Sequence, residues 1–190
     1  MQDAPDSLIE RIRQGEREAL REMYDTFAPS LYRYISFRIT HTQDREDTLS
    51  SVFLRVFEFI ARGAKITNIR AFLYQSTRNA IIDYYRESSR SSSITIEWNE
   101  ELLQDERLST PLLHSEQLVD TAIRNRIIAN ELGNLKEEYR EMLSLRYIED
   151  LEIDEIASIM QKSHIAVRVT LHRALKALKK LVEKTLSANT

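Results

Sequence analysis

Glycine and proline are scarce in this chain, and their scarcity limits its fold more than any other feature. Only three glycines and three prolines interrupt its 190 residues. These two residue types supply most tight turns and helix breaks, so a chain with few of them is expected to be nearly all helix. Strand-like alternation of apolar and polar residues is almost absent. The sequence therefore predicts an all-α fold.

Apolar residues at helical spacing predict four helices in the first half of the chain. We expect the first to run from near the amino terminus past Phe27, the second to open at Pro29, and the fourth to follow a loop at residues 62–67. Caps for the first, third and fourth helices are expected at Asp6 or Ser7, at Asp44 and at Asn68. The third helix has the clearest apolar stripe, formed by Leu49, Val52, Phe53, Val56, Phe57 and Ile60. Such a stripe is the buried face of an amphipathic helix.

The second half of the chain is predicted to be helical as well. Helical periodicity fails between residues 88 and 110, which hold S-S-R-S-S-S and then an acidic mixed stretch, and returns from Ser115 up to a C-cap at Gly133. Further helices are expected at residues 136–148, 153–160 and 164–186. We therefore predict two small helical domains, residues 1–90 and 115–190, joined by a flexible linker at 91–114. Ile94 and Trp98 leave open whether part of this linker docks on a domain or a partner.

The composition excludes several function classes. The chain has no cysteine, which removes disulfides, thiolate catalysis and cysteine-ligated zinc. None of the three glycines belongs to a phosphate-binding loop. The closest histidines, His164 and His172, would lie about 12 Å apart on a helix, too far to share a metal ion. We therefore expect no enzyme activity, no cofactor and no metal site.

The sequence also predicts where the protein is found. Its amino terminus, M-Q-D-A-P-D-S, is acidic and polar. No apolar run approaches the ~20 residues that span a bilayer. We expect neither secretion nor membrane insertion, and a cytoplasmic location.

Charge is strongly segregated along the chain although its formal net value is only −3. Basic residues gather near the carboxyl terminus, at Lys162, Arg168, Arg173, Lys176, Lys179, Lys180 and Lys184, where Glu183 is the only acid. Acids dominate residues 94–120, with Arg107 as the only Lys or Arg there. A solvated surface explains the acidic stretch, whereas the basic stretch lies on a predicted helix and so presents a positive face.

The predicted helix at residues 68–90 interleaves aromatic residues with arginines. Guanidinium groups neutralise phosphates while aromatic faces accept unstacked bases, a pattern typical of proteins that bind single strands. Many of the apolar side chains are equally expected in the helix core, namely Phe72, Leu73, Ile81, Ile82 and Tyr85. The residues left to explain are Arg70, Tyr74, Arg78, Asn79 and Arg86. We predict that these contact a separated nucleic-acid strand.

The last helices have helix-turn-helix proportions. A helix at 153–160 is followed by the short turn Gln161-Lys162-Ser163 and by a second helix that Ser163 can cap. Inward positions of the second helix are Val167, Leu171, Leu175 and Leu178. Its outward side chains, available to duplex DNA, are Arg168, Thr170, His172, Arg173 and Lys176. Two amphipathic helices that only pack in a bundle remain the alternative.

Two stretches together resemble a known family. E-D-T-L-S-S-V-F-L-R-V-F followed by F-L-Y-Q-S-T-R-N-A-I-I-D-Y-Y-R is similar to region 2 of the extracytoplasmic-function (ECF) sigma factors, promoter-specificity subunits of bacterial RNA polymerase. The stretch L-K-E-E-Y-R-E-M-L-S-L-R-Y-I-E-D-L-E-I-D-E-I-A-S-I-M, then V-R-V-T-L-H-R-A-L-K-A-L, resembles region 4 of the same family. Two motifs in this order are more specific than either alone.

The resemblance implies roles for particular residues of the first half. Region 2 binds the polymerase clamp, which would engage Asp47, Phe53, Leu54 and Arg55, although Phe53 is equally placed for the core. Region 2 also captures flipped bases of the minus-ten element, in a pocket that would be formed here by loop residues 64–67. The side chains expected at the separated strand are Lys65, Arg70, Tyr74, Arg78, Asn79 and Arg86.

The resemblance also implies that the second half recognises the minus-thirty-five element as duplex. The expected contacts are Ser163, Arg168, Thr170, His172, Arg173 and Lys176. Implied partners are core RNA polymerase, through its clamp and flap regions, promoter DNA and an anti-sigma factor. No small-molecule substrate is expected. The predicted function is that of an alternative sigma factor, and the alternatives are a stand-alone helix-turn-helix regulator and a sigma-like decoy without promoter activity.

The chain departs from the family pattern at several positions. Ser50-Ser51 replaces the usual Gln-Glu of the clamp-facing helix, and Phe72 stands where tryptophan is common. In the helix-turn-helix, Gln161 replaces the usual turn glycine and Lys162 the usual apolar residue. Positions that are commonly polar or basic in the recognition helix hold Ala166, Val169 and Thr170. These differences predict altered polymerase affinity, strand opening or promoter choice.

Overall fold

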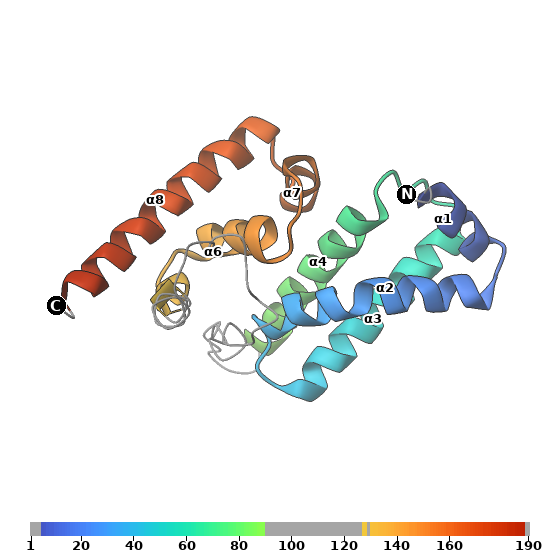
Figure 1. The fold of residues 1–190 in the computed structure, drawn as a ribbon. Coiled ribbons are helices and arrows are strands. Elements are labelled where there is room, and N and C mark those ends of the chain that lie inside the picture. The colour runs from blue at the N-terminus through green and yellow to red at the C-terminus, as the bar shows by residue number, and fades with distance from the viewer. Residues whose placement is uncertain (1–4, 90–126, 129, 189–190) are drawn as a thin grey trace, which may run out of the picture. The chain divides into compact units, whose positions relative to one another are not determined.

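The computed structural model of this chain describes residues 5–89, 127–128 and 130–188, and all of its regular elements there are helices (Figure 1). The all-α prediction is confirmed. The chain divides into two compact units, one within residues 1–97 and one within 98–190. The predicted linker at 91–114, with Ile94 and Trp98, lies outside the described residues, as does most of the helix expected from Ser115. The domain boundaries stay a prediction.

The first unit is built on three long helices that pack on one another. These are α2 (Arg17–Ser36), α3 (Thr42–Ala61) and α4 (Ile69–Ser89), and the shorter α1 (Pro5–Arg13) packs against α2 and α3. Their apolar stripes meet in a core that includes Met23, Leu31, Ile35, Val52, Val56, Ile60 and Leu73. Burial of these stripes, worth roughly 1.5–3 kcal/mol for each large side chain, holds the helices together.

Two predicted helix boundaries in this unit are wrong. The first helix does not run past Phe27, because Gly15, at φ 80°, ends α1 and the chain restarts as α2 at Arg17. Left-handed backbone at a helix end is typical of glycine. Pro29 lies inside α2 rather than opening a helix. The buried face of α2 continues across it, from Met23 to Leu31.

The start of α3 also differs from the expected cap. The helix begins at Thr42, two residues before Asp44, and the Asp44 carboxylate instead accepts a hydrogen bond from the Tyr84 hydroxyl of α4 at 2.8 Å. Burial, and then this hydrogen bond, raises the pKa of Tyr84 to about 12. Asp44 therefore links two helices of the unit instead of ending one.

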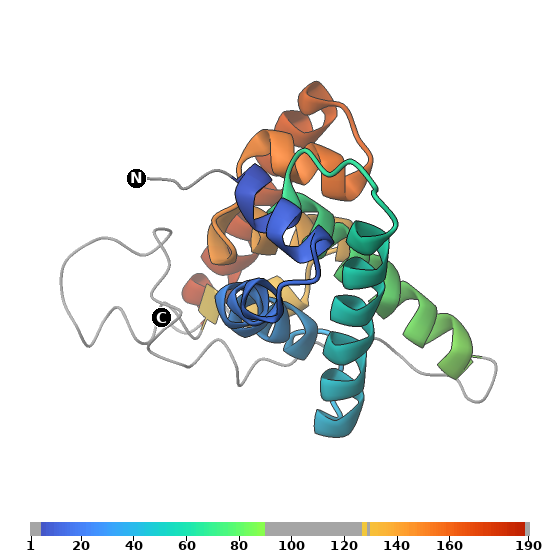
Figure 2. The ribbon, with the colours of Figure 1, turned by 90° about the vertical axis from the view of Figure 1, so that its right-hand side faces the viewer.

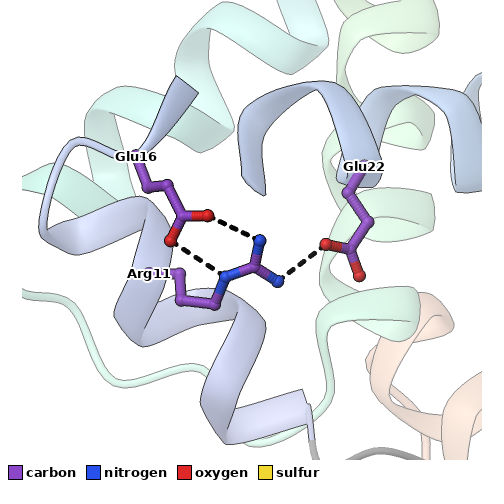
Figure 3. Close-up of polar contacts among 3 residues, drawn as sticks. All are labelled: Arg11, Glu16 and Glu22. Atoms are coloured by element: carbon purple, nitrogen blue, oxygen red, sulfur yellow. Dashed lines mark hydrogen bonds and ion pairs between the residues drawn. The ribbon is translucent and has the colours of Figure 1, made fainter. Parts of the chain in front are cut away.

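Ion pairs attach α1 to the start of α2 (Figure 3). The Arg11 guanidinium donates to both carboxylate oxygens of Glu16, at 2.9 and 2.7 Å, and to Glu22 at 2.7 Å. These hydrogen bonds raise the pKa of Arg11 above its usual range and lower the pKa of Glu16. Because all three side chains are exposed, the contacts orient α1 more than they stabilise it.

The second unit packs α6 (Glu137–Leu143) and α7 (Ile153–Met160) against the long α8 (His164–Ala188). The predicted helix at 136–148 ends in a π-helical turn, Ser144–Ile148. Residues 141–145, which lead into this turn, are all buried. The predicted ranges of α7 and α8 are confirmed, whereas Gly133 is itself helical and does not follow the helix.

Candidate functional site

A short loop between α3 and α4, residues 62–68, is fixed at both ends. At its start Gly63, with φ 83°, follows the end of α3, and the Ala64 amide donates to the Phe59 carbonyl at 3.3 Å. At its end the Asn68 side chain caps α4, accepting from the Ala71 amide at 2.9 Å. The predicted Asn68 cap is thereby confirmed. These contacts hold both ends of the loop in place on the surface of the unit.

Helix α1 supports this loop from the side. The Arg13 guanidinium donates to the Ala64 carbonyl at 3.3 Å and also pairs with Glu10. Figure 2 shows α1 beside the segment that joins α3 to α4. The amino-terminal helix thus contributes to the position of the loop.

An aromatic pair lies across the two ends of the loop. Phe59 of α3 and Phe72 of α4 are stacked, with ring centroids 5.0 Å apart and planes at 21°. Phe59 is 44% exposed, so much of its ring faces solvent. Phe59 was not among the predicted site residues. At about 100° per residue Phe59 lies at the edge of the apolar stripe of α3, about 20° from the buried Val52, so helical spacing alone does not reveal its exposure.

Helix α4 presents most of its predicted strand-binding residues at the surface. Asn79 and Arg86 are exposed, and Arg70 and Arg78 are half-buried, while Lys65 is exposed in the loop. The Arg86 guanidinium lies 3.8 Å from the Asp83 carboxylate. The polar and basic side chains expected at a strand are therefore accessible along the loop and helix.

Tyr74 is a correction to that set. Its side chain is 0% exposed, and its ring packs edge-on against Tyr34 with centroids 5.4 Å apart. A ring with no exposed face cannot stack on a base. Leu73 and Tyr74 are both fully buried, so the side chain of Tyr74 belongs to the core of the unit. The exposed aromatic ring beside the loop is that of Phe59.

The residues predicted to bind polymerase separate into exposed and buried members. Asp47 and Arg55 are exposed, and Leu54 is 62% exposed, which is unusual for a leucine on a long helix. Phe53 is buried between Tyr24 and Phe57, with centroid distances of 4.8 and 5.8 Å. Phe53 therefore lies in the core, which is the alternative that the sequence left open for it. Ser50 is exposed and Ser51 half-buried.

An open groove of about 570 Å³ lies between α2 and α3. Tyr24 and Tyr32 line it together with the carboxylates of Asp25 and Glu46. It adjoins the Asp47 end of α3, because Glu46 and Ser50 belong to its wall. This face therefore combines a hollow with an exposed leucine, a shape suited to a protein partner.

In the second unit the turn between α7 and α8 has the geometry of a helix-turn-helix. Gln161 takes the left-handed conformation, φ 53° and ψ 45°, that glycine usually fills. The Ser163 hydroxyl caps α8 by accepting from the Ala166 amide at 3.2 Å, as predicted. Lys162 pairs with Glu138 of α6 at 2.8 Å. At the start of α7 the Glu155 carboxylate accepts from the Glu152 amide at 2.9 Å.

Helix α8 has one buried and one exposed face. Val167, Leu171, Ala174 and Leu178 are buried, while Leu175 is half-buried. The predicted DNA-contacting side chains are exposed at Ser163, Arg168, His172, Arg173 and Lys176, and half-buried at Thr170. The exposed face also carries two apolar side chains, Ile165 and Val169.

The described part of the chain shows no cluster of three or more potential metal ligands. None of its described helices is long and apolar enough to cross a membrane.

Comparison with known proteins gives two family matches in the predicted order. Residues 23–91 match Sigma-70 region 2, and residues 125–178 match Sigma-70, region 4. The RNA polymerase sigma factor YlaC of Bacillus subtilis (strain 168) is 27% identical over 169 residues, covering 89% of this chain and 95% of YlaC. The ECF RNA polymerase sigma factor SigX of the same strain is 27% identical over 169 residues, covering 87% and 84%.

A solved structure supports the fold. CnrH, in complex with the cytosolic domain of CnrY, superposes with a TM-score of 0.67 at 21% identity, over 96% of this chain and 99% of CnrH.

Proposed function

This chain belongs to the sigma-70 family as an ECF sigma factor, and on that premise we propose how its surfaces divide the work. It is an alternative sigma factor, a subunit that binds core RNA polymerase and directs transcription to particular promoters. The match of its first half to region 2 sets aside a stand-alone helix-turn-helix regulator, which has no use for that region. We propose that residues 1–90 act in polymerase binding and strand opening, 91–114 as linker, and 115–190 in duplex recognition.

The loop at 62–68 and the adjoining face of α4 would hold the separated minus-ten strand. Lys65 and the arginines of α4 supply charge for phosphates, and the exposed Asn79 amide can bond a base edge. Phe59 takes the stacking role first expected of Tyr74. Unstacking a base costs a few kcal/mol, which the contacts of the extruded base must offset. Because the loop is already held in place, binding the base does not require the further loss of entropy that ordering a loop would cost.

The exposed side of α3, with Asp47, Leu54 and Arg55, would bind core polymerase. Leu54 and the neighbouring groove offer apolar area, and the flanking charges orient the partner. The serines at 50 and 51 are smaller than the side chains usual in the family, so they leave more of this face to Leu54 and Arg55.

Helix α8 would lie in the major groove of the minus-thirty-five element. Its exposed Arg168 and Arg173 are long enough to bond guanine edges, while Lys176 and His172 lie on the same surface. The capped start at Ser163 fixes the entry of this helix. Thr170 is half-buried, so it can reach DNA only at the edge of the surface that α8 presents to the groove.

We further propose a cytoplasmic location and an anti-sigma factor as regulatory partner. The similar CnrH has been solved with the cytosolic domain of another protein, CnrY. A partner that covers α3 or α8 would block polymerase or promoter, since both exposed faces are needed at once.

The observation that carries the proposal is the presence, in one chain, of an accessible aromatic and basic loop region and a separate capped helix with an exposed basic face. The test is reconstitution: the purified full chain is mixed with bacterial core polymerase, and transcription is measured from a genomic promoter library. Binding followed by selective initiation supports the proposal and identifies a promoter. Binding without initiation would indicate a decoy, and absence of binding at several salt concentrations would contradict the proposal.

A further inference from the structure

Two apolar side chains on α8 lie outside the protein core. Ile165 is 74% exposed and Val169 is 42% exposed. Both follow the Ser163 cap within the first two turns of the helix. Exposing a large aliphatic side chain forgoes roughly 1.5–3 kcal/mol of burial, so two such residues in one place indicate a surface that is covered in a complex.

Helix geometry places them at the centre of the exposed face. At about 100° per residue, Ile165, Val169 and His172 fall within about 60° of one another. The buried residues Val167 and Leu171 lie on roughly the opposite side. The two apolar residues therefore point away from the unit, in the direction in which a recognition helix contacts DNA.

Cationic side chains surround this apolar pair. On the same exposed face lie Arg168, Arg173 and Lys176. An apolar centre within a basic rim is complementary to a partner that is anionic at its edges and apolar in between. The major groove of duplex DNA offers this at thymines: phosphates border the groove, and the thymine 5-methyl group adds an apolar patch beside the polar base edges.

We propose that Ile165 and Val169 contact thymine 5-methyl groups in the minus-thirty-five element and so make promoter choice depend on thymine at one or two positions. The proposal rests on the proposed function of α8. The first turns of a recognition helix lie deepest in the groove, which is where both residues are found. Arginines then contribute guanine recognition and phosphate contacts, and the apolar pair supplies a separate, methyl-dependent selectivity.

The experiment uses the full chain and the minus-thirty-five duplex selected by the promoter library. Each thymine is replaced singly by deoxyuridine, which removes only the methyl group. For the wild-type protein we expect about fourfold weaker binding at one or two thymines, the effect of one lost buried methyl. Ile165→Ala and Val169→Ala should each bind the thymine duplex more weakly and lose sensitivity to uracil at one of those positions.

Leu186→Ala is the matched control. Leu186 is an exposed apolar residue of the same helix, at 42% exposure, and lies about 31 Å along the axis from Ile165. This variant should keep the full uracil sensitivity of the wild type. Circular dichroism of each variant verifies that the helices are intact.

Three outcomes would overturn the inference. Equal binding of thymine and uracil duplexes by the wild type would show that no methyl is contacted. Uracil sensitivity unchanged in both Ile165→Ala and Val169→Ala would place the methyl contact elsewhere. Loss of a protein partner with DNA binding unaffected would assign the apolar pair to that partner. If Arg168→Ala and Arg173→Ala also leave duplex binding unchanged, the proposed function of α8 itself fails, which separates the two failures.

Discussion

Phe59 and Phe72 stack across the two ends of one loop, with ring centroids 5.0 Å apart, although they belong to different helices. The Phe59 carbonyl accepts from Ala64 at the start of the loop, and the Phe72 amide donates to the Asn68 carbonyl at its end. The pair therefore joins α3 to α4 at the point where the chain turns. Because Phe59 remains 44% exposed, it also offers a ring to whatever the loop binds.

Replacing Phe59 by alanine should weaken binding of a single-stranded minus-ten oligonucleotide to the holoenzyme. A stacked base is worth about 1–3 kcal/mol, so the dissociation constant should rise roughly 5- to 150-fold. Phe59→Tyr keeps a ring and should retain most of the affinity. Fluorescence anisotropy with a labelled oligonucleotide measures the effect.

Leu54→Ala is the control for the Phe59 variant, since Leu54 is also an exposed apolar residue of α3. It lies about 140° around the helix from Phe59. It should lower affinity for core polymerase and leave oligonucleotide binding by the assembled holoenzyme unchanged. A Phe59→Ala protein that lost polymerase affinity instead would place Phe59 in the polymerase interface.

Much of the fold could be predicted from the sequence, for physical reasons. The stripe of α3 has strict helical spacing, and the caps Asn68 and Ser163 combine a polar side chain with a following apolar run. The prediction missed the break at Gly15 because the apolar spacing of α1 continues in register into α2. It also treated Pro29 as a helix start, although a long buried face maintained the helix across it.

The candidate site was less predictable because exposure depends on packing between helices. Tyr74 and Phe59 are both aromatic residues close to the loop, yet Tyr74 is buried against Tyr34 and Phe59 is not. The spacing of apolar residues along α3 and α4 cannot make that distinction, because it depends on how the helices pack on one another. Ile165 and Val169 could have been found, since they fall between the inward positions of α8.

Arg173→Ala should change promoter selection in the duplex-binding unit. If its guanidinium bonds a guanine, its loss should cost about 1–3 kcal/mol at one base pair and relax the preference there. Electrophoretic mobility shifts on a set of single-base variants of the minus-thirty-five element measure this. Lys184→Ala, an exposed cation about 16 Å further along α8, should leave that preference intact. A uniform loss on all sequences would reassign Arg173 to phosphate.

The turn before α8 provides a stability test. Gln161 occupies a left-handed conformation that costs a residue with a Cβ roughly 1–2 kcal/mol, partly offset by the unfolded-state freedom of glycine. Gln161→Gly should therefore raise the free energy of unfolding by about 0.5 kcal/mol. Ser163→Ala removes the cap and should lower it by about 0.5–2 kcal/mol. Urea denaturation measures both, and a stabilising Ser163→Ala would contradict the cap.

The Tyr84 hydroxyl predicts a dependence of stability on alkaline pH. Burial and the hydrogen bond to Asp44 raise its pKa to about 12, whereas an unfolded tyrosine titrates near 10. Its contribution is therefore complete below about pH 10 and is lost as the pH rises towards 12.

Tyr84→Phe should lower the free energy of unfolding at pH 8 by about 0.5–1.5 kcal/mol and flatten the decline between pH 10 and 12. Tyr24→Phe, with its exposed ring, controls for loss of a tyrosine hydroxyl. An alkaline decline as steep in Tyr84→Phe as in the wild type would show that another group causes it.

The assignment of the loop and α4 to strand capture is tested most directly by comparing polymerase binding with strand opening in Asn79→Ala. Asn79 is exposed on α4, whereas the residues proposed to bind polymerase belong to α3, and it should touch only the separated strand. We therefore expect normal affinity for core polymerase and strongly reduced open-complex formation, measured by permanganate reactivity of minus-ten thymines on the promoter that the library identifies. Equal losses of polymerase binding and strand opening, or normal opening by this variant, would contradict the assignment of the loop and α4 to strand capture.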